Sequence, residues 1–100
     1  MSTGFNCEIV SIRADDHPHD GSWFYILQDW NCPVGAWDWR EHATAYGPFA
    51  SEDDAQFHLQ KYQANPGGWS VGENVELDGD DVLRRLVRAA PENLRSIHWP

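Results

Sequence analysis

The chain has 100 residues, of which 41% are hydrophobic and 13% are aromatic, including six tryptophans. This length and content exclude a disordered chain and predict one folded domain over residues 1–100. Sixteen acidic residues against seven basic ones give a formal charge of −9, which disfavours direct binding of DNA or RNA, because such binding depends on Lys and Arg that neutralise phosphates.

The N-terminal sequence MSTGFNCEIVSIR has no basic region followed by an apolar region of the kind that directs secretion. No stretch of the chain approaches the roughly 20 apolar residues needed to cross a bilayer. We therefore expect a cytoplasmic protein without membrane contact. Cys7 and Cys32 lack CxxC spacing, so we expect two free, half-buried thiols.

Strand signals dominate the first half of the chain. Residues 6–13 (NCEIVSIR) alternate loosely and predict a strand. Residues 22–30 (SWFYILQDW) have two largely apolar faces, which is typical of a central strand covered on both sides. Pro33 and Gly35 predict a turn, after which residues 36–46 (AWDWREHATAY) return as an antiparallel partner.

The clearest helix signal follows Ser51. This residue is a predicted N-cap with Asp54 at the capping-box position, acidic residues occupy the first turn, and the sequence NPGG ends the helix. The apolar stripe of the helix consists of Ala55, Leu59 and Tyr62, with His58 beside it. We expect this stripe to pack on the sheet.

The remaining residues predict one strand and a second helix. Residues 69–77 (WSVGENVEL) form a short strand or extended segment. The second helix begins at Asp80 or Asp81, and Pro91 opens a last turn. One face of this helix is apolar and the other carries three arginines; the apolar residues are Val82, Leu83, Leu86, Val87 and Ala90, and the outward residues are Arg84, Arg85 and Arg88.

These elements predict an α+β fold, in which an antiparallel sheet of three to four strands packs against two helices in a two-layer single domain. In a two-layer domain one face of the sheet has no cover. Because the aromatic residues of this chain populate both faces of the hairpin, the uncovered face would be an apolar patch larger than monomers usually expose. We therefore expect a homodimer.

The tryptophans of WDWR are the first candidates for a binding site. On a strand, Trp37 and Trp39 point to one face, while Asp38 and Arg40 point to the other. A buried tryptophan face predicts core residues packed against Leu59 and Tyr62 of the first helix, and an outward face predicts a binding platform. We expect burial, which leaves two other tryptophans as the exposed anchors: Trp30 and Trp69.

Two groups carry residue types used in catalysis. His17 and His19 flank a proline in the loop ADDHPHDGS, but a third metal ligand at defined spacing is missing. Cys32 and His42 are a candidate nucleophile and base, with Asp38 or Glu41 to orient the base, but no oxyanion turn accompanies them. We expect no enzyme activity, cofactor or metal; the alternative is a small metal- or thiol-dependent enzyme that uses one of these pairs.

Acidic residues form several clusters. Their simplest interpretation is solvated loops and helix starts. The functional alternative is one electronegative face that mimics a phosphate track and occupies the basic groove of a partner. That face would combine Glu52, Asp53 and Asp54 with Glu73, Glu76, Asp78, Asp80 and Asp81.

The run YGPFASEDDAQFHLQ resembles the strand–GPF–Ser–helix junction of SPOR-type peptidoglycan-binding domains and of many small phage proteins. In such a junction Gly47 and Pro48 end a strand and Phe49 packs under the helix. The acidity of this site and the missing export signal do not fit glycan binding. As a whole, the chain is similar in size, charge and tryptophan content to the small inhibitor proteins of bacteriophages and mobile elements, anti-CRISPR proteins among them.

Charge and this similarity together predict a small, acidic, non-enzymatic interaction protein. Its partner would be a host protein or nucleoprotein with a basic surface, which the acidic residues would attract over long range. Such a chain would act as a phage-type inhibitor or a nucleic-acid mimic.

Overall fold

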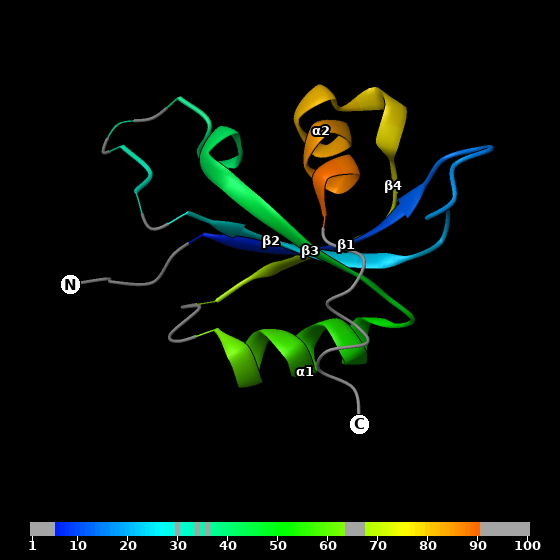
Figure 1. Cartoon of the computed structure of the whole chain (residues 1–100), viewed down its shortest axis with the longest axis horizontal. Coiled ribbons are helices and arrows are strands. Elements are labelled where there is room, and N and C mark those ends of the chain that lie inside the picture. The colour runs from blue at the N-terminus through cyan, green and yellow to red at the C-terminus, as the bar shows by residue number, and fades with distance from the viewer. Residues whose placement is uncertain (1–5, 30, 34, 36, 64–67, 91–100) are drawn as a thin grey trace.

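A four-stranded sheet runs through the centre of the molecule, with one helix on each face (Figure 1). The computed structural model describes residues 6–29, 31–33, 35, 37–63 and 68–90. The strands are β1 (Cys7–Arg13), β2 (Trp23–Gln28), β3 (Ala43–Phe49) and β4 (Ser70–Glu76). The helices are α1 (Glu52–Tyr62) and α2 (Asp81–Ala89), with short 3-10 helices η1 (Trp39–His42) and η2 (Leu77–Gly79).

The strand order is β3-β2-β1-β4, and the sheet is mixed. β2 pairs antiparallel with β1 and with β3. β4 pairs parallel with β1, because the chain leaves β3 at one edge and crosses one face of the sheet through α1 before it forms the other edge. Because of this crossover, α1 covers one face of the sheet and leaves the other face to α2.

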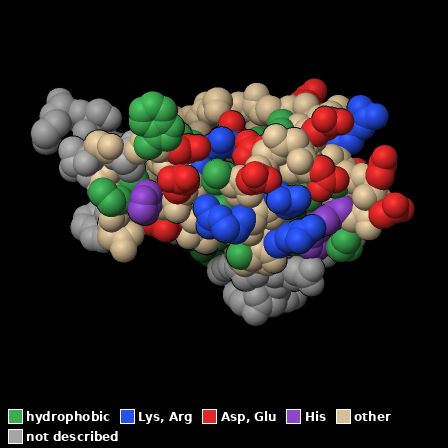
Figure 2. All heavy atoms as spheres, turned by 90° about the horizontal axis from the view of Figure 1, so that it is seen from above, with side chains coloured by type: hydrophobic (Ala, Val, Ile, Leu, Met, Phe, Trp, Pro, Cys, Tyr) green, Lys and Arg blue, Asp and Glu red, His purple; other side chains and the backbone are tan. Residues whose placement is uncertain are grey.

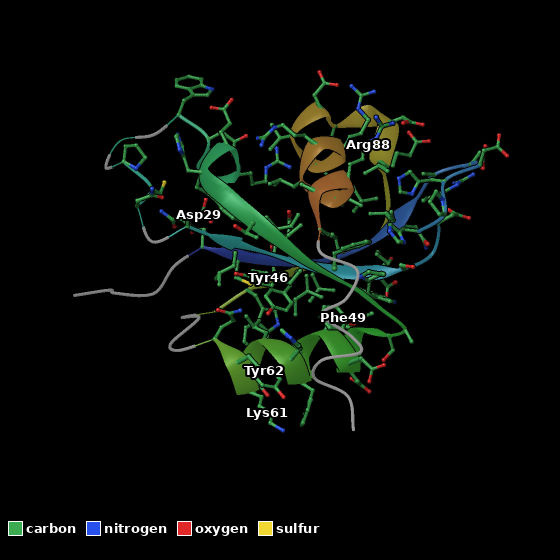
Figure 3. The ribbon with its side chains drawn as sticks, in the orientation of Figure 1. Asp29, Tyr46, Phe49, Lys61, Tyr62 and Arg88 are labelled. Carbon is green, nitrogen blue, oxygen red and sulfur yellow. The ribbon has the colours of Figure 1, made fainter. Side chains whose placement is uncertain are left out.

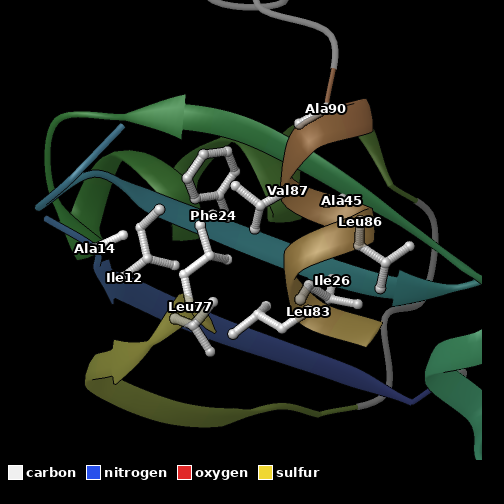
Figure 4. Packing of buried hydrophobic residues seen from close by; sticks show 11 residues of the cluster. Ile12, Ala14, Phe24, Ile26, Ala45, Leu77, Leu83, Leu86, Val87 and Ala90 are labelled. Carbon is white, nitrogen blue, oxygen red and sulfur yellow. The ribbon is translucent and has the colours of Figure 1, made fainter. Parts of the chain in front are cut away.

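The larger core lies between the sheet and α2 (Figure 4). Phe24 and Ile26 of β2 point into it, and Leu83, Leu86 and Val87 of α2 close it from above. Its other buried members are Val10, Ile12, Ala14, Ala45, Leu77 and Ala90. The predicted apolar face of the second helix is therefore the face that packs on the sheet.

The second core lies between the sheet and α1. Tyr25, which alternates with Phe24 and Ile26 along β2, points to this side and is fully buried. Its buried partners are Cys7, Ile9, Phe49, Ala55 and Leu59, with Trp23, Leu27, Tyr46 and Trp69 partly buried around them. The prediction that residues 22–30 contain a central strand covered on both sides is confirmed.

Side-chain caps start both helices as predicted. The Ser51 hydroxyl accepts a hydrogen bond of 3.1 Å from the backbone N–H of Asp54. The Asp80 carboxylate accepts one of 3.0 Å from the backbone N–H of Leu83. Each cap satisfies a donor that the first turn of a helix otherwise leaves unpaired.

The α+β class is confirmed, with differences in the arrangement of its parts. The sheet is not wholly antiparallel, and the helices lie on opposite faces, which makes three layers in place of two. The sheet face that we expected to be uncovered is covered by α2. The apolar patch that led us to expect a homodimer is therefore already buried within the chain.

β3 also differs from its prediction. It begins at Ala43, after η1, and continues through Gly47 and Pro48 to Phe49, so these two residues do not end a strand. Pro48 is tolerated because β3 is an edge strand. Gly47 has a φ of +144°, and a Cβ there would lie 2.8 Å from the Phe24 ring, so glycine is needed for this close approach.

Within the described part of the chain, no helix is long and apolar enough to span a bilayer. The turn predicted after Pro91 falls in residues 91–100, outside the described residues.

Candidate functional site

The most exposed large hydrophobic side chain of the described residues is Trp37, at 99%. The prediction that Trp37 belongs to the core was wrong. It assumed that residues 36–46 form one strand, but the backbone turns into η1 at Trp39. Trp37 and Trp39 therefore do not share a strand face, and Trp37 projects into solvent from the loop between β2 and β3.

Trp39 is partly buried, as expected, but on the other side of the sheet from the predicted one. It packs against the cluster under α2 and not against α1. Of its two predicted contacts, Leu59 is fully buried in the α1 core and Tyr62 is 38% exposed. Trp39 thus holds the loop that carries Trp37 against the body of the protein.

Arg40 joins this loop to α2. The Asp38 carboxylate accepts a hydrogen bond of 3.0 Å from the backbone N–H of Arg40 and so caps η1. The Arg40 guanidinium lies 3.3 Å from the Asp38 carboxylate and 2.6 Å from that of Asp80. Two carboxylates on one guanidinium fix the position of the loop beside the first turn of α2.

These contacts shift the pKa of each partner. The hydrogen bond to Asp80, followed by that to Asp38, raises the pKa of Arg40 against the opposing effect of burial. The backbone hydrogen bond from Arg40 lowers the pKa of Asp38 below its ordinary value. Burial acts to raise the pKa of Asp80, but its hydrogen bonds with Leu83 and Arg40 together outweigh burial and lower it. All three groups are thus held in their charged forms.

A groove of about 770 Å³ lies between η1 and α2. Its lining carries three arginines against two acids, so it is net positive in a chain of formal charge −9. The lining residues are Glu41, Asp81, Val82, Arg84, Arg85, Arg88 and Ala89. Figure 2, which looks onto this side of the molecule, shows Lys and Arg side chains near the middle of the face with Asp and Glu side chains around them.

The arginines of the groove differ in their partners. Arg84 donates to the Asp81 carboxylate at 2.8 Å. Arg85 and Arg88 are exposed, and neither forms an ion pair or side-chain hydrogen bond with the described residues. Figure 3 shows Arg88 on α2, on the opposite side of the sheet from Lys61 and Tyr62 of α1. Two cations are therefore available to a ligand in the groove.

The predicted acidic residues fall on both sides of the sheet. The first turn of α1 carries Glu52, Asp53 and Asp54, on the face opposite to α2. Asp80 and Asp81 start α2 and are paired with arginines. Glu73 lies exposed on β4. Two further acids, Glu76 and Asp78, line a hollow of about 310 Å³ together with Arg13, Ala14, Asp15 and Gly79.

Of the two predicted tryptophan anchors, Trp30 lies outside the described residues. Trp69 is partly buried against the cluster under α1, so the structure does not place it as a free anchor.

The two residue pairs predicted for an alternative enzyme site lie in different segments: His17 and His19 between β1 and β2, and Cys32 and His42 between β2 and β3. His17 accepts a hydrogen bond of 3.1 Å through Nδ1 from the backbone N–H of His19. Among the described residues, no three or more His, Cys, Asp or Glu side chains are grouped so that they could hold a metal ion. The Cys32 thiol lies 3.7 Å from the Pro33 carbonyl oxygen, and no hydrogen bond links Cys32 with His42 in the described ranges.

Sequence reasoning also missed a buried polar pair. The Tyr25 hydroxyl and His58 Nδ1 are 2.7 Å apart under α1, and Gln63 donates to the same hydroxyl at 3.1 Å. Burial raises the pKa of Tyr25 well above its ordinary value. Because both rings are fully enclosed by the α1 core, we interpret the pair as structural.

Two sequence signals could have located the exposed site. Asp38 and Glu41 have capping-box spacing, which marks the start of η1 and argues against a continuous strand. Arg85 and Arg88 are three residues apart on a helix, so they point in similar directions.

No protein-family model, curated protein or solved structure matches this chain.

Proposed function

We propose that the chain is a non-enzymatic interaction protein that binds a partner protein through Trp37, which precedes η1 in the chain, and through the groove between η1 and α2. The observation that carries this proposal is the 99% exposure of Trp37. Burying an aromatic side chain removes roughly 150–250 Å² from water. At about 25 cal/mol per Å², this is roughly 4–6 kcal/mol of gross hydrophobic free energy that folding leaves unused and a partner can recover.

The setting of Trp37 supports a binding role over an incidental exposure. Asp38 caps the helical turn that follows, Arg40 ties this turn to α2, and Trp39 packs into the core beside it. These contacts hold the backbone that follows Trp37, and a segment held before binding loses less conformational freedom when the complex forms. Trp and Arg are also the residues that most often dominate binding energy at protein interfaces.

The charge of the chain supports a partner with a basic surface. At a formal charge of −9, long-range attraction favours encounter with cationic proteins and speeds association at low salt. In its specific form the proposal is a phage-type inhibitor of a host protein or nucleoprotein, of the kind that anti-CRISPR proteins represent. Size and acidity support this form, and the host protein is identified by the experiment below.

The test is affinity capture with three versions of the protein in parallel: wild type, Trp37→Ala and Val71→Ala. Val71 is the matched control, because it is also an exposed apolar residue, at 46%, but lies on β4. We expect a polypeptide that wild type and Val71→Ala retain and Trp37→Ala loses. A partner retained equally by all three would contradict the role of Trp37.

A further inference from the structure

We propose that the groove between η1 and α2 binds a carboxylate-bearing segment of the partner protein, and that Arg85 and Arg88 hold the carboxylate. The inference deepens the proposed function and rests on it. It concerns the chemistry of the partner at one point of the interface, whereas the attraction to a basic surface concerns the charge of the partner as a whole.

The pairing of the basic residues near the groove leads to this inference. Arg40 and Arg84 are already held by acids of the chain, at 2.6 Å from Asp80 and 2.8 Å from Asp81. Arg85 and Arg88 are exposed in the groove and form no ion pair within the described residues. Two guanidinium groups without an acidic partner in the described part of the chain can hold an anion that comes from outside.

The spacing of the two arginines suits a carboxylate. Residues three apart on a helix lie about 5–6 Å from each other at Cβ, so both guanidinium groups can reach one carboxylate or two neighbouring ones. A guanidinium presents donors in a planar fork that matches the two oxygens of a carboxylate.

The negative charge of the chain does not cancel this local attraction. Charges further than about 8 Å are largely screened at physiological ionic strength. Within the groove itself the lining is net positive: Arg84 pairs with Asp81, and Glu41 is the lining acid for which the described residues provide no ion pair. A bound carboxylate would therefore meet mainly Arg85 and Arg88.

The same lining disfavours a nucleic acid. Glu41 and the many acidic residues around the groove would repel successive phosphates, which extend beyond a short site. Val82 and Ala89 add apolar surface between the charged groups. A polypeptide that combines acidic and apolar side chains fits this surface better than a phosphate backbone does.

The test is NMR titration of the isotope-labelled protein with synthetic probes, which does not require the natural partner. The probes are a ten-residue peptide of Leu and Gln with two neighbouring Glu at its centre, the same peptide with Gln in place of those Glu, and a ten-nucleotide oligothymidylate. We expect the Glu peptide to shift the side-chain Nε–Hε signals of Arg85 and Arg88, with binding weakened at least fivefold by 0.5 M NaCl. The Gln peptide should leave these signals in place.

Variants locate the effect. Arg85→Gln combined with Arg88→Gln should weaken the Glu peptide at least fivefold. The charge-matched control is Arg13→Gln combined with Lys61→Gln, because both residues are exposed and lie outside the groove. This control should change binding less than twofold.

Four outcomes would overturn the inference: no shift with the Glu peptide, equal weakening by the control pair, tighter binding of oligothymidylate, or shifts that follow protein concentration alone and so indicate a second copy. The titration is repeated with Val71→Ala, in which the groove should still bind. If the Glu peptide does not bind but capture of the partner still depends on Trp37, only this inference is wrong. If the Glu peptide binds but capture of the partner does not depend on Trp37, the proposed function is wrong.

Discussion

The guanidinium of Arg40 and the carboxylate of Asp80 are 2.6 Å apart, although the residues are 40 positions apart in the sequence. The same carboxylate caps α2 through the backbone N–H of Leu83. One side chain therefore starts a helix and fixes the loop that presents Trp37.

The two roles of Asp80 can be separated by substitution. Asp80→Asn keeps an acceptor for the helix cap but loses the charge that holds Arg40, whereas Asp80→Ala loses both. We expect Asp80→Ala to lower the free energy of unfolding by about 1–2 kcal/mol and Asp80→Asn by less. Urea denaturation measures both values. Equal losses would show that the cap contributes nothing.

Acid should destabilise the protein through the same contacts. The backbone hydrogen bond from Arg40 lowers the pKa of Asp38, and hydrogen bonds with Leu83 and Arg40 lower the pKa of Asp80 despite the opposing effect of burial. A carboxyl whose pKa is lower in the folded state contributes stability that is complete above its unfolded pKa, ordinarily 3.8, and that is lost as pH falls through the folded pKa.

The free energy of unfolding should therefore decline as the pH is lowered below about 4, and Asp80→Asn should reduce that decline. Denaturation curves at several pH values check this expectation. A decline of the same size in Asp80→Asn would mean that other carboxyl groups control the acid response.

Several parts of the fold could be predicted from the sequence because their causes are local. Ser51 and Asp80 mark helix starts through their own side chains, and the two apolar faces of β2 require cover on both sides. The parallel pairing of β4 depends on the path of α1 across the sheet, which no local pattern encodes.

The candidate site was harder to predict for a related reason. The position of Trp37 depends on whether residues 39–42 are strand or helix, and the alternation of side chains in this segment predicts a strand. The capping-box spacing of Asp38 and Glu41 favours a helical turn instead. The contact of Arg40 with Asp80 stabilises that turn. The groove joins η1 to α2, so its lining could not be assembled before the two were known to meet.

Trp37 and Trp39 should respond oppositely to truncation. Trp39 packs against the α2 core, so Trp39→Ala should lower the free energy of unfolding by about 2–4 kcal/mol. Trp37→Ala removes an exposed side chain and should change it by less than about 0.5 kcal/mol. Thermal or urea denaturation of both variants compares them directly. A large loss in Trp37→Ala would show that the indole has a structural role.

The two cysteines should differ in reactivity. Cys7 is buried, and burial raises the pKa of its thiol to about 12, so almost no thiolate is present at neutral pH. Cys32 is only half-buried. We expect an aromatic disulfide reagent to titrate one thiol in the native protein and two after unfolding, with Cys32→Ser leaving the native protein unreactive. Rapid labelling of Cys7 in Cys32→Ser would contradict its placement in the core.

The most direct measurement of the central claim is ¹⁹F NMR of protein labelled with 5-fluorotryptophan, before and after addition of the captured partner. The chain contains six tryptophans, and the signal that disappears in Trp37→Phe is the one of interest. Because Trp37 is fully exposed, its signal should show the full solvent isotope shift in the free protein. In the complex this signal should move furthest and lose that isotope shift. A saturated complex in which the Trp37 signal keeps its position and its isotope shift would contradict the assignment of Trp37 as the anchor.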